Sequence, residues 1–136
     1  MDKALVFACD KYEFAFDIEC IKEIKSWIPS TPLPVENQNI EGIINIRGTV
    51  IPLISLLNLI GGQKVAENKA IIVIECMGKN IAFSVSGVSD IIEYDLLKEA
   101  PKNCFGGNDF IKGIISIGKR TIFSLNENNI LKYVIN

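Results

Sequence analysis

Cysteines are the side chains of this sequence with the clearest capacity for chemistry, as nucleophiles or as metal ligands. The chain has Cys9, Cys20, Cys76 and Cys104, with no CxxC spacing among them, and it contains no histidine. A zinc site built from Cys and His is therefore not expected, and no base is evident that would lower the pKa of a thiol. We predict no metal and no cofactor, with the thiols buried or half-buried. A Cys-dependent enzyme or redox switch is the alternative.

Carboxylates could also perform acid–base chemistry, but here they are scattered. Glu19, Glu23, Glu36 and Glu41 form no paired acid–base signature. The sequence also has neither a GxSxG nucleophile elbow nor a phosphate-binding P-loop. We therefore expect a protein that is not an enzyme.

Two charged residues lie in apolar surroundings. Glu23 lies between Ile21 and Ile24, and Arg47 follows an apolar run and precedes Gly48. A carboxylate and a guanidinium can pair through parallel hydrogen bonds, which fixes geometry as well as contributing energy. The sequence thus predicts a pair between Glu23 and Arg47, while a solvated charged face is the simpler alternative.

The composition indicates an ordinary globular protein. Of the 136 residues, 49% are hydrophobic and 22% are charged, and the net charge is -2. A nucleic-acid partner is not expected, because phosphate contacts require an excess of Lys and Arg. No apolar run reaches the roughly 18 residues that a membrane span requires. The N-terminus lacks the layout of a secretory signal. We expect a cytoplasmic protein with no direct membrane insertion.

Short apolar runs, rich in isoleucine and valine, recur along the chain in the same order. This pattern is typical of strands, and its recurrence indicates an internal duplication. Chance similarity of apolar strands is the alternative. The paired segments are 5–9 with 72–76, 14–24 with 81–91, and 40–46 with 111–117. Segments 40–46 and 111–117 are each followed by another apolar strand and then by a short helical stretch, at 55–60 and 129–135 respectively.

The duplication predicts the fold class. We expect an all-β protein of two similar lobes, roughly 1–65 and 66–136 of a single domain 1–136, joined by a connection around 61–69. Strand exchange between the lobes is possible. Because about 65 residues bury a marginal fraction of their surface, the lobes should share a core. Asp90 corresponds to Glu23, but Gly118 corresponds to Arg47, so we expect the charge pair in the first lobe only.

One segment carries a specific family resemblance. Residues 40–54 match, at every defined position, a signature with Gly42, then Asn45, Arg47 and Gly48, and finally Pro52, separated by hydrophobic residues. The chain resembles the CheW-like domain family of chemotaxis coupling proteins. Segments 12–24, 82–91 and 110–125 also resemble parts of the family pattern. The whole resemblance covers about residues 5–131.

This resemblance implies a fold and a function. It implies two five-stranded SH3-like β-barrels on a common core, and a signalling adaptor that catalyses nothing. The implied partners are the regulatory domain of the histidine kinase CheA and the cytoplasmic tips of methyl-accepting chemoreceptors, with recruitment to membrane receptor arrays and a monomer in isolation. The receptor-binding groove carried over from the family comprises Ile21, Glu23, Ile24, Gly42, Arg47, Val88 and Ile91.

Other interpretations stay open at this stage. Core packing could equally explain the four apolar groove residues. A small-ligand sensor, or a divergent regulatory domain in a non-chemotaxis kinase pathway, could use the same fold. The chain also departs from the family pattern, with Ser55 and Leu57 where Asp and Arg are usual, and Ser86 where Asp is common. These departures concern the partner surface and not the fold.

Overall fold

The computed structural model describes residues 2–34, 40–61, 67–102, 104–105 and 109–135. Glu36 and most of the predicted connection between the repeats, 62–66, lie outside the described residues. Strands dominate the chain, in the order β1 Asp2–Cys9, β2 Tyr12–Asp17, the short 3-10 helix η1 Ile18–Cys20, β3 Ile21–Ser26, β4 Gly42–Ile46, β5 Thr49–Ser55, α1 Leu56–Ile60, β6 Ala70–Cys76, β7 Lys79–Val85, β8 Gly87–Tyr94, β9 Ile111–Ile117, β10 Arg120–Leu125 and α2 Glu127–Ile135.

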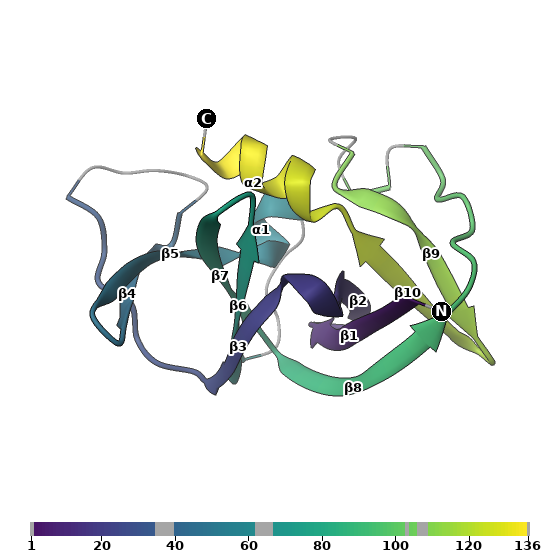
Figure 1. Cartoon of the computed structure of the whole chain (residues 1–136), viewed down its shortest axis with the longest axis horizontal. Coiled ribbons are helices and arrows are strands. Elements are labelled where there is room, and N and C mark those ends of the chain that lie inside the picture. Colours follow the sequence, from purple (N-terminus) through teal and green to yellow (C-terminus); the bar gives the residue numbers. More distant parts are fainter. Residues whose placement is uncertain (1, 35–39, 62–66, 103, 106–108, 136) are drawn as a thin grey trace.

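The strands form two five-stranded sheets, which confirms the predicted fold class. Their orders are β8-β1-β2-β10-β9 and β3-β6-β7-β5-β4. Each sheet curls so that its two edge strands approach each other. In the first sheet, Lys98, after β8, forms a bridge with Ile114 of β9, and in the second, Thr31, after β3, forms a bridge with Ile43 of β4. Figure 1 shows the two lobes, with α2 along the upper edge of the view and β8 along the lower edge.

Each sheet contains strands from both repeats. One sheet takes β1 and β2 from the first repeat and β8, β9 and β10 from the second. The other sheet takes β3, β4 and β5 from the first repeat and β6 and β7 from the second. The division at about residue 65 therefore separates the repeats and not the sheets. The two sheet orders are identical once equivalent strands are matched, so the lobes are related by an approximate two-fold axis.

The two edge strands β8 and β3 pair with their neighbours in the same register, residue by residue. In β1 and β8, Phe7 lies opposite Val88, and the register shifts between Val6 and Phe7. In β3 and β6, Ile21 lies opposite Ile74, with a shift at the same point. A bulge adds a residue and bends a strand, so its repetition gives β3 and β8 the same local shape.

Among the residues that the structure describes, strand alternation produces three apolar clusters. Along β1, Ala4 and Val6 point into one lobe, whereas Leu5 and Phe7 point into a core shared by both lobes. The other lobe has its own cluster of seven buried residues, among them Ile44 and Leu53. The predicted shared core is therefore present.

The shared core is centred on the repeat. Phe16 and Phe83, which are equivalent residues, lie with ring centroids 5.1 Å apart, one from each sheet. Both helices cover this core with buried side chains, since Leu56 and Ile60 of α1 and Ile130 of α2 belong to it. Neither lobe could keep this apolar surface from water alone, and burial of such surface is the main stabilising term in folding.

Candidate functional site

The four apolar residues predicted for the groove lie on equivalent edge strands. Ile21 and Ile24 belong to β3, and Val88 and Ile91 occupy the matching positions of β8. β3 pairs with β6, β8 pairs with β1, and in the described part of the chain neither edge strand has a second strand neighbour. We call these four residues the β3/β8 strip.

Exposure divides the strip into two pairs. Ile21 and Val88 are half-buried and pack against the shared core. Ile24 is 46% exposed and Ile91 is 59% exposed. The core-packing alternative therefore accounts for the first pair and not for the second. Two large apolar side chains at equivalent positions face solvent.

The predicted charge pair flanks the strip at β3. An Nη2–H of Arg47 donates to Oε1 of Glu23 at 2.7 Å, which confirms the pairing. The Glu23 side chain is 19% exposed and that of Arg47 is 79% exposed. The carboxylate is thus covered while the guanidinium faces outward.

A tight turn presents the guanidinium. Arg47 and Gly48 form the turn between β4 and β5, with φ values of 52° and 84°. Two-residue hairpin turns favour positive φ, which few residues other than Gly, Asn and Asp adopt readily. The side-chain Oδ1 of Asn45 accepts the Gly48 N–H at 2.9 Å and supports this turn. The signature residues Asn45, Arg47 and Gly48 thus act together locally.

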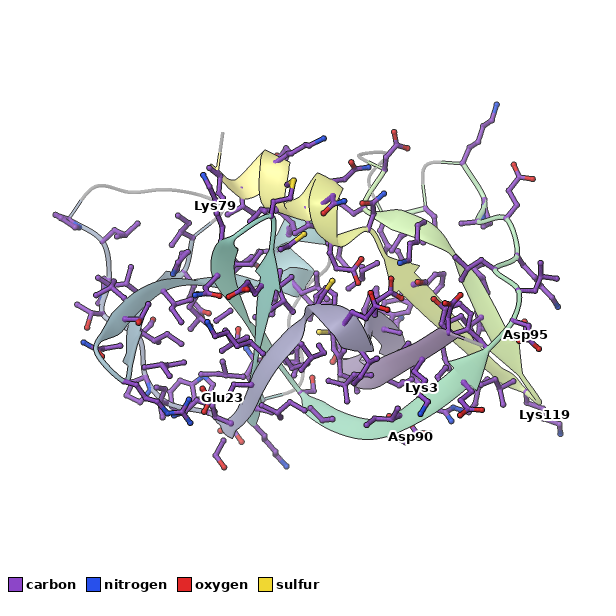
Figure 2. All side chains as sticks on the ribbon, viewed as in Figure 1. Lys3, Glu23, Lys79, Asp90, Asp95 and Lys119 are labelled. Carbon is purple, nitrogen blue, oxygen red and sulfur yellow. The ribbon has the colours of Figure 1, made fainter. Side chains whose placement is uncertain are left out.

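The expectation that only one lobe makes this pair is wrong. Asp90, the equivalent of Glu23, accepts from Nη1 and Nη2 of Arg120 at 3.1 and 3.0 Å. Arg120 also donates to both carboxylate oxygens of Glu13, at 2.9 and 3.2 Å. Arg120 lies two positions beyond Gly118, at the start of β10, and its side chain is long enough to reach Asp90 from there. Figure 2 labels Glu23 and Asp90, both along the lower part of the view.

Asp90 and Arg120 also stabilise each other's charged form. Hydrogen bonds from Arg120 and Ser89 hold the pKa of Asp90 below its usual value. The same hydrogen bonds to Asp90, and those to Glu13, raise the pKa of Arg120. This is the behaviour of a carboxylate and a guanidinium joined by charge-assisted bonds.

Gly42 is placed against the chain's own loop. A Cβ at Gly42 would clash with the Ser30 Oγ and would lie 2.8 Å from the Thr31 carbonyl oxygen. The equivalent glycine, Gly113, is similarly close to Leu97 and Lys98. The close backbone approach expected at Gly42 is thus made within the lobe, where the bridge between Thr31 and Ile43 closes the barrel.

Each of the three departures from the family pattern has a place in the fold. Leu57 is 5% exposed in the shared core, and Ser55 is 8% exposed at the start of α1. The Ser86 Oγ accepts the Asp10 N–H at 2.8 Å, which ties the turn after β1 to the crossover between β7 and β8. These side chains serve packing and turn geometry.

One polar cluster was not anticipated from the sequence. Lys112 Nζ donates to Oδ2 of Asp17 at 2.6 Å, and Tyr94 donates to Oδ1 of Asp17 at 2.9 Å. Glu127, 6% exposed, accepts the Asp17 N–H at 2.7 Å and lies 3.5 Å from Lys112. The cluster joins the end of β2 to β8, β9 and α2, at the point where the chain crosses between lobes.

The pKa values in this cluster reflect burial and charge together. Burial raises the pKa of Glu127, although hydrogen bonds and Lys112 oppose it. Burial would lower the pKa of Lys112, but the bond to Asp17 and the neighbouring carboxylates raise it. No sequence spacing signals the cluster, because its members come from distant strands.

The cysteines are buried or half-buried, as expected. Cys9 and Cys76 are buried, and Cys20 and Cys104 are half-buried. Burial raises the pKa of Cys9 and of Cys20 to about 12. Among the described residues there is no group of three or more His, Cys, Asp or Glu that could hold a metal ion.

Three surface concavities lie away from the strip. The first, about 450 Å³, lies at residues 99–102, Cys104 and residues 109–112. The second, about 250 Å³, lies near Asp17, and the third, about 480 Å³, lies near Tyr12 and Phe123. None of the three is lined by a strip residue. Within the described ranges, no helix is both long enough and apolar enough to span a membrane.

Similarity to known proteins extends over almost the whole chain. Residues 3–134 match the family model for the CheW-like domain. The chain is 33% identical over 128 residues to a probable chemotaxis protein CheW from Rhizobium etli, covering 89% of this chain and 82% of that protein. It is 30% identical over 136 residues to the chemotaxis protein CheW of Thermotoga maritima, covering 97% and 89%.

A solved structure has the same architecture. The crystal structure of the scaffolding protein TtCheW from Thermoanaerobacter tengcongensis superposes with a TM-score of 0.85 at 27% sequence identity. The match covers 93% of this chain and 84% of that chain. Sequence and structure comparisons thus agree on one family.

Proposed function

The chain belongs to the CheW-like domain family, and we propose that it is a non-catalytic adaptor of bacterial chemotaxis. In this proposal it joins the cytoplasmic tips of methyl-accepting chemoreceptors to the regulatory domain of the histidine kinase CheA. It acts in the cytoplasm, at membrane receptor arrays, and is a monomer in isolation. The relatives named chemotaxis protein CheW and the neighbour titled a scaffolding protein support this assignment.

The observation that carries the receptor-binding part is the exposure of Ile24 and Ile91 on the strip, with the outward-facing guanidinium of Arg47 at its β3 end. A helix that docks on a protein needs an apolar surface with a few polar anchors. Ile24 and Ile91 supply apolar contact, and Arg47, 79% exposed in its side chain, supplies hydrogen-bond donors. Glu23 holds the guanidinium in place. The receptor tip, a helical coiled coil, matches these requirements.

The kinase is proposed to use a different surface. The resemblance to the family implies contact between barrels, which would leave the β3/β8 strip to the receptor. Separate surfaces permit the simultaneous binding that an adaptor requires.

A capture experiment with purified components tests the proposal. The tagged chain is incubated with the cytoplasmic fragment of a receptor from the same organism, with the CheA regulatory domain, and with both together. We expect each to be retained alone and a ternary complex to form from all three. Failure to retain either partner would refute the adaptor function. Competition between the two partners would refute the separate surfaces.

A further inference from the structure

The two ends of the β3/β8 strip have the same backbone but differ in hydrogen bonding. Glu23 and Asp90 occupy equivalent positions next to equivalent bulges. Each pairs with an arginine from the following hairpin, Arg47 or Arg120. Shape alone therefore distinguishes poorly between the two directions in which a helical partner could lie along the strip.

The two arginines differ in the donors left for a partner. Among the described residues, Arg47 donates only to Glu23, and its side chain is 79% exposed. Arg120 makes four hydrogen bonds, to Glu13 and Asp90, and its side chain is 35% exposed. A guanidinium has five N–H donors, so Arg47 keeps most of them and Arg120 has almost none to offer.

The nearby lysines do not remove this difference. Lys11 and Lys119 line a concavity that also includes Glu13 and Arg120 but does not include Asp90. A lysine ammonium on a flexible stem is a point charge without the fixed fork of a guanidinium. Lys22 and Lys25 lie on β3 itself, and Lys22 is paired with Glu75 at 3.1 Å. Arg47 is the group at the β3 end whose fixed fork of donors can orient a partner carboxylate.

We propose that the strip binds a helical segment of its partner in one direction only, with a partner carboxylate on Arg47 and none on Arg120. This inference rests on the proposed receptor binding and names the residue that selects the orientation. Glu13 is that residue, because it occupies two of the donors of Arg120. Charge complementarity at one end thus breaks the two-fold symmetry of the scaffold.

Photocrosslinking at matched positions tests the proposal. Val50 and Thr121 are equivalent, exposed, and close in sequence to Arg47 and Arg120. Benzoylphenylalanine is placed at one or the other, the protein is mixed with the receptor cytoplasmic fragment, and crosslinked peptides are identified by mass spectrometry. We expect each position to label a different receptor segment. Labelling of the same two segments from both positions would overturn the single orientation.

Release of Arg120 provides the second arm of the test. Glu13→Val removes both acceptor oxygens and places a β-branched residue in a strand. We expect both positions then to label both segments, because Arg120 now competes for the partner carboxylate. The control Glu75→Val removes an exposed strand carboxylate paired with Lys22 and should keep the wild-type pattern.

The remaining outcomes are also decisive. An unchanged pattern in Glu13→Val would refute the selector role of Glu13. Receptor retention without crosslinks from either position would place the partner elsewhere and refute the inference. Loss of receptor retention by the wild-type protein would instead refute the proposed function, so the two failures are distinguishable.

Discussion

Arg47 combines an unfavourable backbone conformation with an exposed side chain. A positive φ is uncommon for a residue other than Gly, Asn or Asp, and in this turn it directs the guanidinium toward Glu23. The pair is partly exposed, so its stabilising contribution is modest, because solvent screens such interactions.

A double-mutant cycle measures this pair. We expect Glu23→Gln and Arg47→Gln to show a coupling of about 0.5 kcal/mol in the free energy of unfolding, which is the range of exposed ion pairs and interacting neighbours. Urea unfolding of the two single variants and the double variant gives the value. Strict additivity would mean that the two charges are independently solvated.

The buried thiols lead to a prediction about reactivity. The thiolate is the nucleophile, and a pKa of about 12 leaves about one thiolate in 10⁵ for Cys9 or Cys20 at pH 7. We expect both to alkylate with iodoacetamide far more slowly in the folded protein than in urea. Mass spectrometry over time follows the reaction. Rapid, stoichiometric alkylation of the folded protein would favour a Cys-dependent function.

Sequence reasoning located the first charge pair and missed the second for a physical reason. Gly118 stands where Arg47 stands in the first repeat, so comparison by position found no partner for Asp90. Arg120, two positions beyond Gly118 at the start of β10, reaches Asp90 because its side chain is long. Positional equivalence follows the backbone, while ion pairs depend on the reach of the side chains.

At the scale of elements, the closing of each barrel depends on a glycine. Gly42 and Gly113 face the loops that follow β3 and β8, at distances that leave no room for a Cβ. Because the two glycines are equivalent, both barrels close through the same close contact between a strand and the loop that follows an edge strand.

Alanine substitution tests that role. We expect Gly42→Ala to lower the free energy of unfolding by about 1–3 kcal/mol, the usual cost of overpacking, since the Thr31 carbonyl oxygen is backbone and has little freedom to move. Gly87→Ala is the matched control in β8, where a Cβ would meet nothing within 4 Å. Equal stability of Gly42→Ala and wild type in chemical denaturation would contradict this account.

The cluster at the start of α2 predicts a pH dependence. Folding raises the pKa of Glu127, so its stabilising contribution is present below the unfolded pKa and is lost as pH rises through the folded pKa. Glu127→Gln removes that contribution. The free energy of unfolding of the variant relative to wild type should therefore increase as pH rises above the usual pKa of a glutamate. A difference that is constant or falls with pH would contradict the assignment.

The order of elements was predictable from the sequence, but their pairing was not. The repeated apolar runs indicated the strands, and the helical spacing near Ile130 indicated α2. Both repeats have the same alternation of apolar and polar residues, so the apolar pattern alone does not decide which of two equivalent strands pairs into a given sheet. Only the three-dimensional structure shows that β1 and β2 join the strands of the second repeat.

At the scale of the whole molecule, strand exchange places the two edge strands in equivalent positions. Figure 1 shows β8 along the lower edge of the view and α2 along the upper edge. The strip residues Ile24 and Ile91, which the family resemblance suggested, are exposed, whereas Ile21 and Val88 also support the core. Substitutions at the exposed pair therefore separate binding from folding more cleanly than substitutions at the half-buried pair.

Receptor capture by Ile91→Glu tests the central claim most directly. Ile91 is 59% exposed, so a glutamate there should leave the melting temperature unchanged. Within a complex it would be a buried, unpaired charge, and we expect receptor capture to fall by about tenfold or more, as for a central interface residue. Binding of the CheA regulatory domain should persist. Ile135→Glu on α2, at a site 45% exposed, is the control and should bind both partners. A folded Ile91→Glu protein that captures the receptor as well as wild type would contradict the account.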